Sequence, residues 1–109
     1  MDQAEVKSMI IRVLEDIRER LPLWVGTEPL AIIPYLNGFY HGCHLFGLKG
    51  GGYDKVYEET VIERGWKWGS LGAMPSMREK GLDDEAIALE LVTLEIESWK
   101  KRLNAASDS

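Results

Sequence analysis

The densest group of reactive side chains is the run Tyr40-His41-Gly42-Cys43-His44 near the middle of the chain. On a helix, residues three apart are neighbours, so His41 and His44 are spaced to share a metal ion. A closed zinc site needs four ligands, and the chain supplies no second pair of histidines or cysteines. We therefore expect no metal and no cofactor, and His41 and His44 are the candidates if a metal does bind.

Cys43 is the only cysteine of the chain, so no intrachain disulfide can form. Its neighbour His44 cannot act as its base, because consecutive helical residues point about 100° apart. We predict that Cys43 is a small buried apolar residue. The acidic residues Glu58, Glu59 and Glu63 are interpreted as a solvated helix face, and no catalytic residue is predicted.

Aromatic and glycine residues mark the places where a ligand or partner could bind. Tryptophan dominates both protein cores and binding hot spots, and the chain has four. We assign Trp99 to the core, whereas Trp66 and Trp68 could equally pack under a loop or face a partner. The residues predicted to bind a ligand or a partner are Trp24, Tyr40, His41, His44, Trp66 and Trp68. Gly38 and Gly42, four apart on one helical face, would let a second helix approach closely.

The apolar spacing predicts four main helices to position these residues. The first is capped by Asp2, is stopped by Pro22 and carries one apolar stripe that we expect to be buried. This stripe consists of Val6, Met9, Ile10, Val13, Leu14, Ile17 and Leu21. The segment Leu23-Trp24-Val25-Gly26 is too short for a helix of its own. The second helix runs from near Glu28 to about Gly47.

Glycines organise the second half of the chain. The run Gly50-Gly51-Gly52 is a hinge or a loop tip, and a short third helix follows it and ends at Gly65. The stretch 65–82 is interpreted as a loop with one helical turn, although a small strand pair around Trp24 and Trp66 is an open alternative. Asp83 then caps the last and longest helix. That helix has two adjoining apolar stripes, one of Leu89, Val92, Ile96, Trp99 and Leu103 and one of Ile87, Leu91 and Leu94.

Length and composition point to one folded domain. The 109 residues are 45% hydrophobic and 28% charged, which is ordinary for a globular chain. We predict an all-α fold, a compact bundle of about four main helices, with a Gly/Trp-rich loop between the third helix and the last. The domain spans residues 1–104, and a frayed polar tail follows over residues 105–109.

Charge and hydropathy exclude several classes of partner. Thirteen Lys and Arg against eighteen Asp and Glu leave a net charge of −5. Nucleic acid is therefore not expected as a partner, because a phosphate backbone requires a concentrated positive surface. No segment approaches the roughly 20 apolar residues of a membrane span, and no secretion signal is expected. Together with the single cysteine, these features favour the cytoplasm.

Two runs of the chain follow a recognisable pattern. The first is Ile17-Arg18-Glu19-Arg20-Leu21-Pro22-Leu23-Trp24-Val25-Gly26, and the second is Leu36-Asn37-Gly38-Phe39. They resemble the pattern I-R-x-R-P-x-M-Y-L-G, followed by F-L-x-G-Y, of a family of small uncharacterised bacterial proteins. Here the proline falls one position later, and Trp24 stands where tyrosine is usual. The resemblance implies a small helical protein of accessory or mobile gene content, as in immunity-like proteins, and implies no catalytic residues.

We therefore expect a non-enzymatic protein that acts by contact with another protein, as a homodimer. Dimerisation would bury the surplus apolar stripe of the last helix or the glycine face at Gly38 and Gly42. The alternative is a small-molecule-binding or metal-binding protein, or an enzyme. Its pocket would be lined by Tyr40, His41, His44, Trp66 and Trp68. A purely structural role is the third hypothesis.

Overall fold

Helices form all the regular structure in the described part of the chain. The computed structural model describes residues 2–45 and 55–107, apart from the side chains of residues 44 and 105–107. These residues form six α-helices and one 3₁₀ helix and contain no strand. The predicted all-α class is confirmed, with six helices in place of about four. The predicted end of the second helix near Gly47 and the hinge at Gly50-Gly51-Gly52 lie outside the described residues.

The chain begins with two consecutive helices. The backbone N–H of Glu5 donates a hydrogen bond of 2.8 Å to Asp2 Oδ1, which is the predicted cap of α1 (Gln3–Glu19). A second helix of five residues, α2 (Leu21–Val25), follows almost at once. The prediction that this segment is too short for a helix is wrong. Pro22 stands in the first turn of α2, where its missing N–H costs no intrahelical hydrogen bond.

The second predicted helix is α3 (Ile32–Leu45), and the chain enters it through the 3₁₀ turn η1 (Pro29–Ala31). Gly26 ends α2 with a φ of 64°, a conformation that glycine adopts at little cost. Pro34 lies in the first turn of α3, where a backbone N–H has no acceptor within the helix. The missing N–H of the proline therefore costs α3 no hydrogen bond. The α-helix thus begins at Ile32, four residues after the predicted start near Glu28, because the 3₁₀ turn η1 precedes it.

The Gly/Trp-rich loop joins α4 (Lys55–Glu63) to α5 (Met74–Glu79). Beyond α4 the chain turns at Gly65, as predicted, and the φ of 89° there favours glycine. The only β-type contact in the described residues is an isolated bridge between Gly69 and Gly72. The alternative of a small strand pair is therefore not realised in this loop.

The last helix, α6 (Asp84–Ser107), is the longest of the described helices, as predicted. The backbone N–H of Ala86 donates a 2.8 Å hydrogen bond to Asp83 Oδ1, which is the predicted cap. The helix continues to Ser107, so its last turn includes residues that we assigned to the tail.

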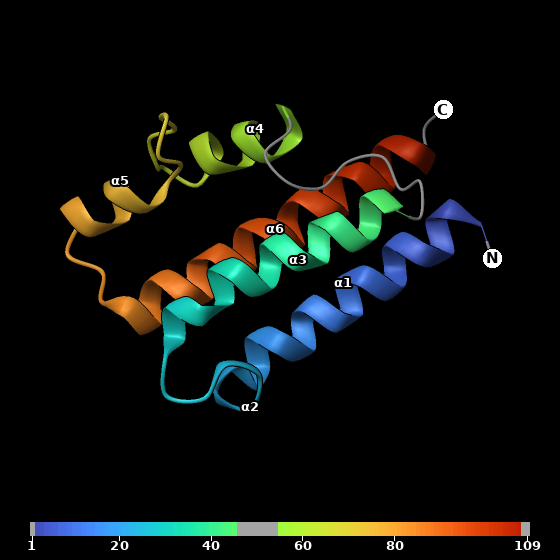
Figure 1. Cartoon of the computed structure of the whole chain (residues 1–109). Coiled ribbons are helices and arrows are strands. Elements are labelled where there is room, and N and C mark those ends of the chain that lie inside the picture. The colour runs from blue at the N-terminus through green and yellow to red at the C-terminus, as the bar shows by residue number, and fades with distance from the viewer. Residues whose placement is uncertain (1, 46–54, 108–109) are drawn as a thin grey trace.

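Helix α6 separates two hydrophobic clusters. Figure 1 shows α1 and α3 on one side of α6 and α4 and α5 on the other. α6 contributes Ala88, Val92, Ile96 and Trp99 to the first cluster and Ile87 and Leu94 to the second. Both predicted stripes are thus covered within one chain, with one difference. Leu89 is partly exposed, and Ala88 instead of Leu89 belongs to the first cluster. No surplus stripe of α6 is left for a dimer to bury.

Helix α1 packs closely along α6 and runs antiparallel to it, with Leu14 and Ile17 fully buried between the two helices and α3. Figure 1 also shows α1 and α2 at the edge of the helix arrangement, so none of the described helices covers one long side of α1. No helix in the described ranges is long and apolar enough to cross a membrane.

Candidate functional site

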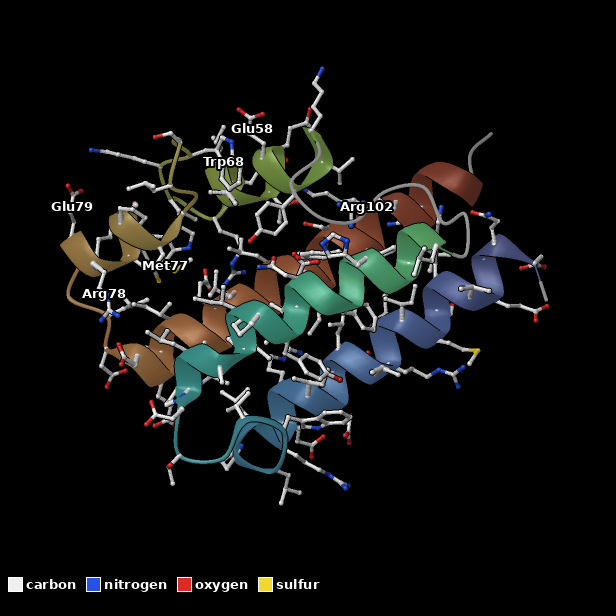
Figure 2. All side chains as sticks on the ribbon, in the orientation of Figure 1. Glu58, Trp68, Met77, Arg78, Glu79 and Arg102 are labelled. Atoms are coloured by element: carbon white, nitrogen blue, oxygen red, sulfur yellow. The ribbon has the colours of Figure 1, made fainter. Side chains whose placement is uncertain are left out.

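The residues of the predicted pocket lie on both sides of α6. Tyr40 of α3 is buried in the first hydrophobic cluster, whereas Trp66 and Trp68 pack against the second. Figure 2 shows Trp68 next to α4. His41 is exposed on α3, and the side chain of His44 lies outside the described part. Tyr40 and the two tryptophans therefore do not line one pocket.

Trp66 and Trp68 are held by contacts within the chain. The Trp66 indole N–H donates a hydrogen bond to the Glu90 carboxylate of α6, which also accepts two hydrogen bonds from Arg64, at 2.9 and 2.8 Å. The Lys80 ammonium stands 5.3 Å from the centre of the Trp66 ring. Trp68 packs edge-on against the Tyr57 ring, with centroids 5.6 Å apart. These contacts fasten the loop to α4 and α6.

Within the described part of this chain, Gly38 and Gly42 make no close contact with another helix, and the predicted contact with a second copy stays a prediction. A side-chain Cβ built at either position would meet, apart from its two chain neighbours and the nearby backbone of α3 itself, no described atom within 4 Å. Gly38 is exposed, and Gly42 is only partly buried. Within the described part of the chain, therefore, no second backbone approaches this face of α3.

Cys43 is buried, as predicted. Burial raises the pKa of its thiol, and the positive charge of Arg102 opposes that shift. A thiol with a raised pKa is a poor nucleophile at neutral pH. Within the described ranges, no group of three or more His, Cys, Asp and Glu side chains is placed to hold a metal ion.

Trp24 belongs to an exposed surface that the sequence pattern did not identify. Together with Met9, Arg12, Val13 and Asp16 it lines a shallow groove of about 400 Å³, and these five residues are called the α1–α2 face below. Met9, Val13 and Trp24 are 43%, 40% and 39% exposed, respectively. The prediction that Met9 and Val13 belong to a buried stripe is therefore wrong.

The helical positions explain this error. At 100° per residue, Met9 lies about 140° around the helix from the fully buried Leu14, and Val13 lies 100° from it. The seven apolar residues assigned to one stripe thus spread over more of the helix than a single neighbouring helix covers. The wide arc of the seven apolar residues therefore indicates, from the sequence alone, that α1 presents apolar side chains on two sides.

The charged members of the α1–α2 face differ in their intrachain partners. Asp16 pairs with Arg20, one turn further along α1, at 3.4 Å. Arg12 makes no ion pair with any residue in the described ranges. Trp24 is oriented by an edge-on contact with the Tyr35 ring of α3, with centroids 5.7 Å apart. The face therefore presents an oriented aromatic ring beside an arginine whose charge is not paired within the described chain.

A second unusual region is a polar group buried along α6. Glu95 is fully buried, and neither of its carboxyl oxygens has a hydrogen-bond partner among the described residues. The indole N–H of Trp99 likewise has none there. Arg102 stacks over the Trp99 ring, with its Cζ 4.8 Å from the ring centre. Burial raises the pKa of Glu95 to about 8, against the opposing charge of Arg102, so the carboxyl group is protonated at neutral pH.

We did not single out Glu95 from the sequence, although a signal was present. At 100° per residue, Glu95 and Arg102 fall on the arc of α6 between the two apolar stripes. If both stripes are buried, everything on the arc between them is buried too. Two adjoining stripes on one helix therefore predict a buried carboxylate and a buried guanidinium, and the structure has both.

Comparison of the chain with protein-family models, with curated proteins and with solved structures gave no match. The resemblance to a family of small bacterial proteins therefore stays a prediction. The function has to be argued from the geometry of the α1–α2 face and of the buried group on α6.

Proposed function

We propose that this chain acts by protein contact and that the α1–α2 face makes the contact. The observation that carries the proposal is the clustering of Met9, Val13 and Trp24, each about two-fifths exposed, around one groove. Leu23, the neighbour of Trp24 in α2, is exposed as well. Exposed apolar side chains that gather in one place mark interaction surfaces, because a partner removes them from water together.

Trp24 is the expected centre of this contact. Tryptophan is enriched among the residues that carry most of the binding free energy at protein interfaces. The edge-on contact with Tyr35 orients the ring before a partner arrives, which lowers the entropy lost on binding. Arg12 and Asp16 border the apolar residues, as charged residues border the dry centre of an interface.

Two kinds of partner fit this proposal, a second copy of the chain and a different protein. We propose that the contact occurs in the cytoplasm, since a reducing compartment suits a protein whose only cysteine is a buried thiol. We propose no reaction for the protein, because the described residues assemble no nucleophile and base on a shared cleft.

Site-specific photo-crosslinking in the cells that naturally make the protein tests the proposal. A benzoylphenylalanine at Val13 should yield one discrete protein adduct. The matched control is the same cross-linker at Ile62, an exposed apolar residue of α4 on the other side of α6. Trp24→Ala should remove the Val13 adduct without unfolding the chain. No adduct from Val13, or the same adducts from Val13 and Ile62, would overturn the proposal.

A further inference from the structure

We infer that the α1–α2 face binds the same face of a second copy of this chain, with the two α1 helices antiparallel about a two-fold axis. This inference rests on the proposed function and names its partner. The surfaces on which we first based a dimer were the extra stripe of α6, which is covered within the chain, and the glycine face of α3. The α1–α2 face has the properties that self-pairing requires.

The charges along the outer side of α1 are self-complementary. The N-terminal end carries Asp2 and Glu5 and the middle carries Arg12. The C-terminal end carries three acidic residues, Glu15, Asp16 and Glu19, beside Arg20. In the antiparallel register that places Arg12 opposite Asp16, Arg20 of one helix lies opposite Ser8 of the other, one turn from Glu5. The register that places Arg12 opposite Asp16 of the second copy forms that ion pair twice, because a two-fold axis repeats every contact.

The intrachain contacts are consistent with this register. Arg12 makes no ion pair with a described residue of its own chain, so its charge is available to a partner. Asp16 uses one oxygen for Arg20 and is 43% exposed at its side chain. A carboxylate has several acceptor positions, so Asp16 can accept a hydrogen bond from a second guanidinium as well.

The shape of the face fits the same register. A second shallow hollow, of about 380 Å³, continues the groove toward the start of α1 and shares Met9 and Arg12 with it. Ala4, Glu5 and Ser8 line its far part. When Arg12 lies opposite Asp16 of the second copy, the C-terminal end of α1 in one copy, which leads into α2 and Trp24, lies beside the far part of this hollow in the other copy. Each Trp24 then meets Ala4 and Ser8 of the other copy, beside its carboxylates Asp2 and Glu5.

The size of the face indicates how strongly the two copies associate. A helix of 17 residues is about 25 Å long, and only one side of it takes part. A single pair of such helices with two tryptophans falls near the lower end of specific interfaces, about 1,200 Å² in total. We therefore expect a reversible dimer whose population depends on concentration in the micromolar range.

Charge reversal on the intact chain tests the inference. Sedimentation velocity and native mass spectrometry over about 1–500 μM should show a dimer of the unmodified protein. Arg12→Glu alone and Asp16→Arg alone should each raise the dissociation constant about tenfold or more, because each places like charges opposite each other twice. Glu59→Arg, a reversal on the exposed side of α4, should leave the dimer unchanged.

Mixing the two weakened variants is the decisive step. A chain with Arg12→Glu and a chain with Asp16→Arg complement each other at both pairs, so the mixture should form a heterodimer at concentrations at which each variant alone is mostly monomeric. Circular dichroism melts of each variant verify that α1 stays folded. A mixture that stays monomeric, or a dimer that Arg12→Glu leaves unchanged, would overturn the antiparallel pairing.

A monomer at every concentration would overturn the second copy as the partner. The photo-crosslinking above then separates this failure from failure of the proposed function. A Val13 adduct with the mass of two chains supports the inference. An adduct with a different protein retains the proposed function and overturns the inference, and no adduct overturns both.

Discussion

On the outer side of α1, the apolar side chains of Met9 and Val13 are partly exposed to solvent. On α6, by contrast, the carboxyl group of Glu95 and the indole N–H of Trp99 are buried. The first region leaves apolar surface exposed, and the second leaves polar atoms buried with no hydrogen-bond partner in the described part of the chain. The exposed apolar surface costs the single chain little, because much of any protein surface is apolar. Burying a polar group without a partner costs about 1–3 kcal/mol or more.

The two regions respond to different changes of condition. The α1–α2 face gains free energy only when a partner covers it, so its effect depends on concentration. The group around Glu95 affects the stability of the single chain, and its effect depends on pH. Variants that separate these two dependences test the comparison directly.

The largest effect is expected from Glu95→Gln, measured as the free energy of unfolding against pH. The pKa of Glu95 in the folded chain is about 8, above its ordinary value of 4.5. Between these pH values the folded state holds a proton that the unfolded state has released, so stability falls as pH rises. The slope approaches a tenfold change in the folding equilibrium per pH unit, which accumulates to several kcal/mol by pH 8.

Glu95→Gln should remove this slope and make the protein more stable than the unmodified chain above pH 8. The matched control is Glu97→Gln on the same helix, because the Glu97 side chain is 41% exposed. The control should leave the slope unchanged. Stability that holds constant or rises between pH 5 and pH 8 would mean that Glu95 is ionised in the folded protein.

The next effect is expected from two neighbours on α1. Leu14 is fully buried, so Leu14→Ala should lower the free energy of unfolding by about 2–5 kcal/mol. Val13→Ala should change it by about 0.5 kcal/mol or less, and should weaken self-association. Chemical denaturation at a concentration where the protein is monomeric measures the first effect, and sedimentation measures the second. Equal losses of stability in the two variants would contradict the exposure of Val13.

A smaller effect is expected from Glu90→Ala. Glu90 lies on the same helix as Glu95, but its carboxylate has hydrogen-bond partners. Glu90 accepts hydrogen bonds from Arg64 and from the indole of Trp66. Its loss should lower the free energy of unfolding by about 1–3 kcal/mol. Trp66 fluorescence should shift as the loop loosens. Glu90 and Glu95 variants thus change stability in opposite directions at pH 8, and the same direction for both would refute the contrast.

A modest effect on folding is expected from Trp24→Ala. The variant loses the edge-on contact with Tyr35, which is worth about 1 kcal/mol, and the packing of the part of the Trp24 side chain that is not exposed. The free energy of dimer association should weaken by more than the free energy of unfolding of the single chain falls. A large loss of stability with unchanged association would make Trp24 a core residue instead of a contact residue.

Much of the fold was predictable because the signals were local. The cap at Asp2, the cap at Asp83 and the glycine at Gly65 act through the few residues beside them, and each stands in the structure as predicted. The short helix α2 was missed, because Pro22 both stops α1 and suits the start of another helix. Local signals of this kind do not say which of the two roles prevails.

The candidate site was predicted only at Trp24. The other pocket residues were grouped by residue type, but α6 stands between Tyr40 and the tryptophans Trp66 and Trp68. Which residues face each other across a bundle depends on how the helices are stacked. That arrangement follows from contacts far apart in the sequence, and the spacing along one helix does not determine it.

The amino-acid sequence by itself determined that this protein is built of helices, where most of them begin and end, and that its last helix is apolar on two adjoining stripes. Hydrophobic spacing and caps act within one or two turns, so each segment carries these properties alone. The tertiary structure decided which apolar side of α1 is covered and that Glu95 has no hydrogen-bond partner among the described residues. Burial is a property of the neighbours, and α1 has helices on only one side of it, whereas α6 is enclosed from both.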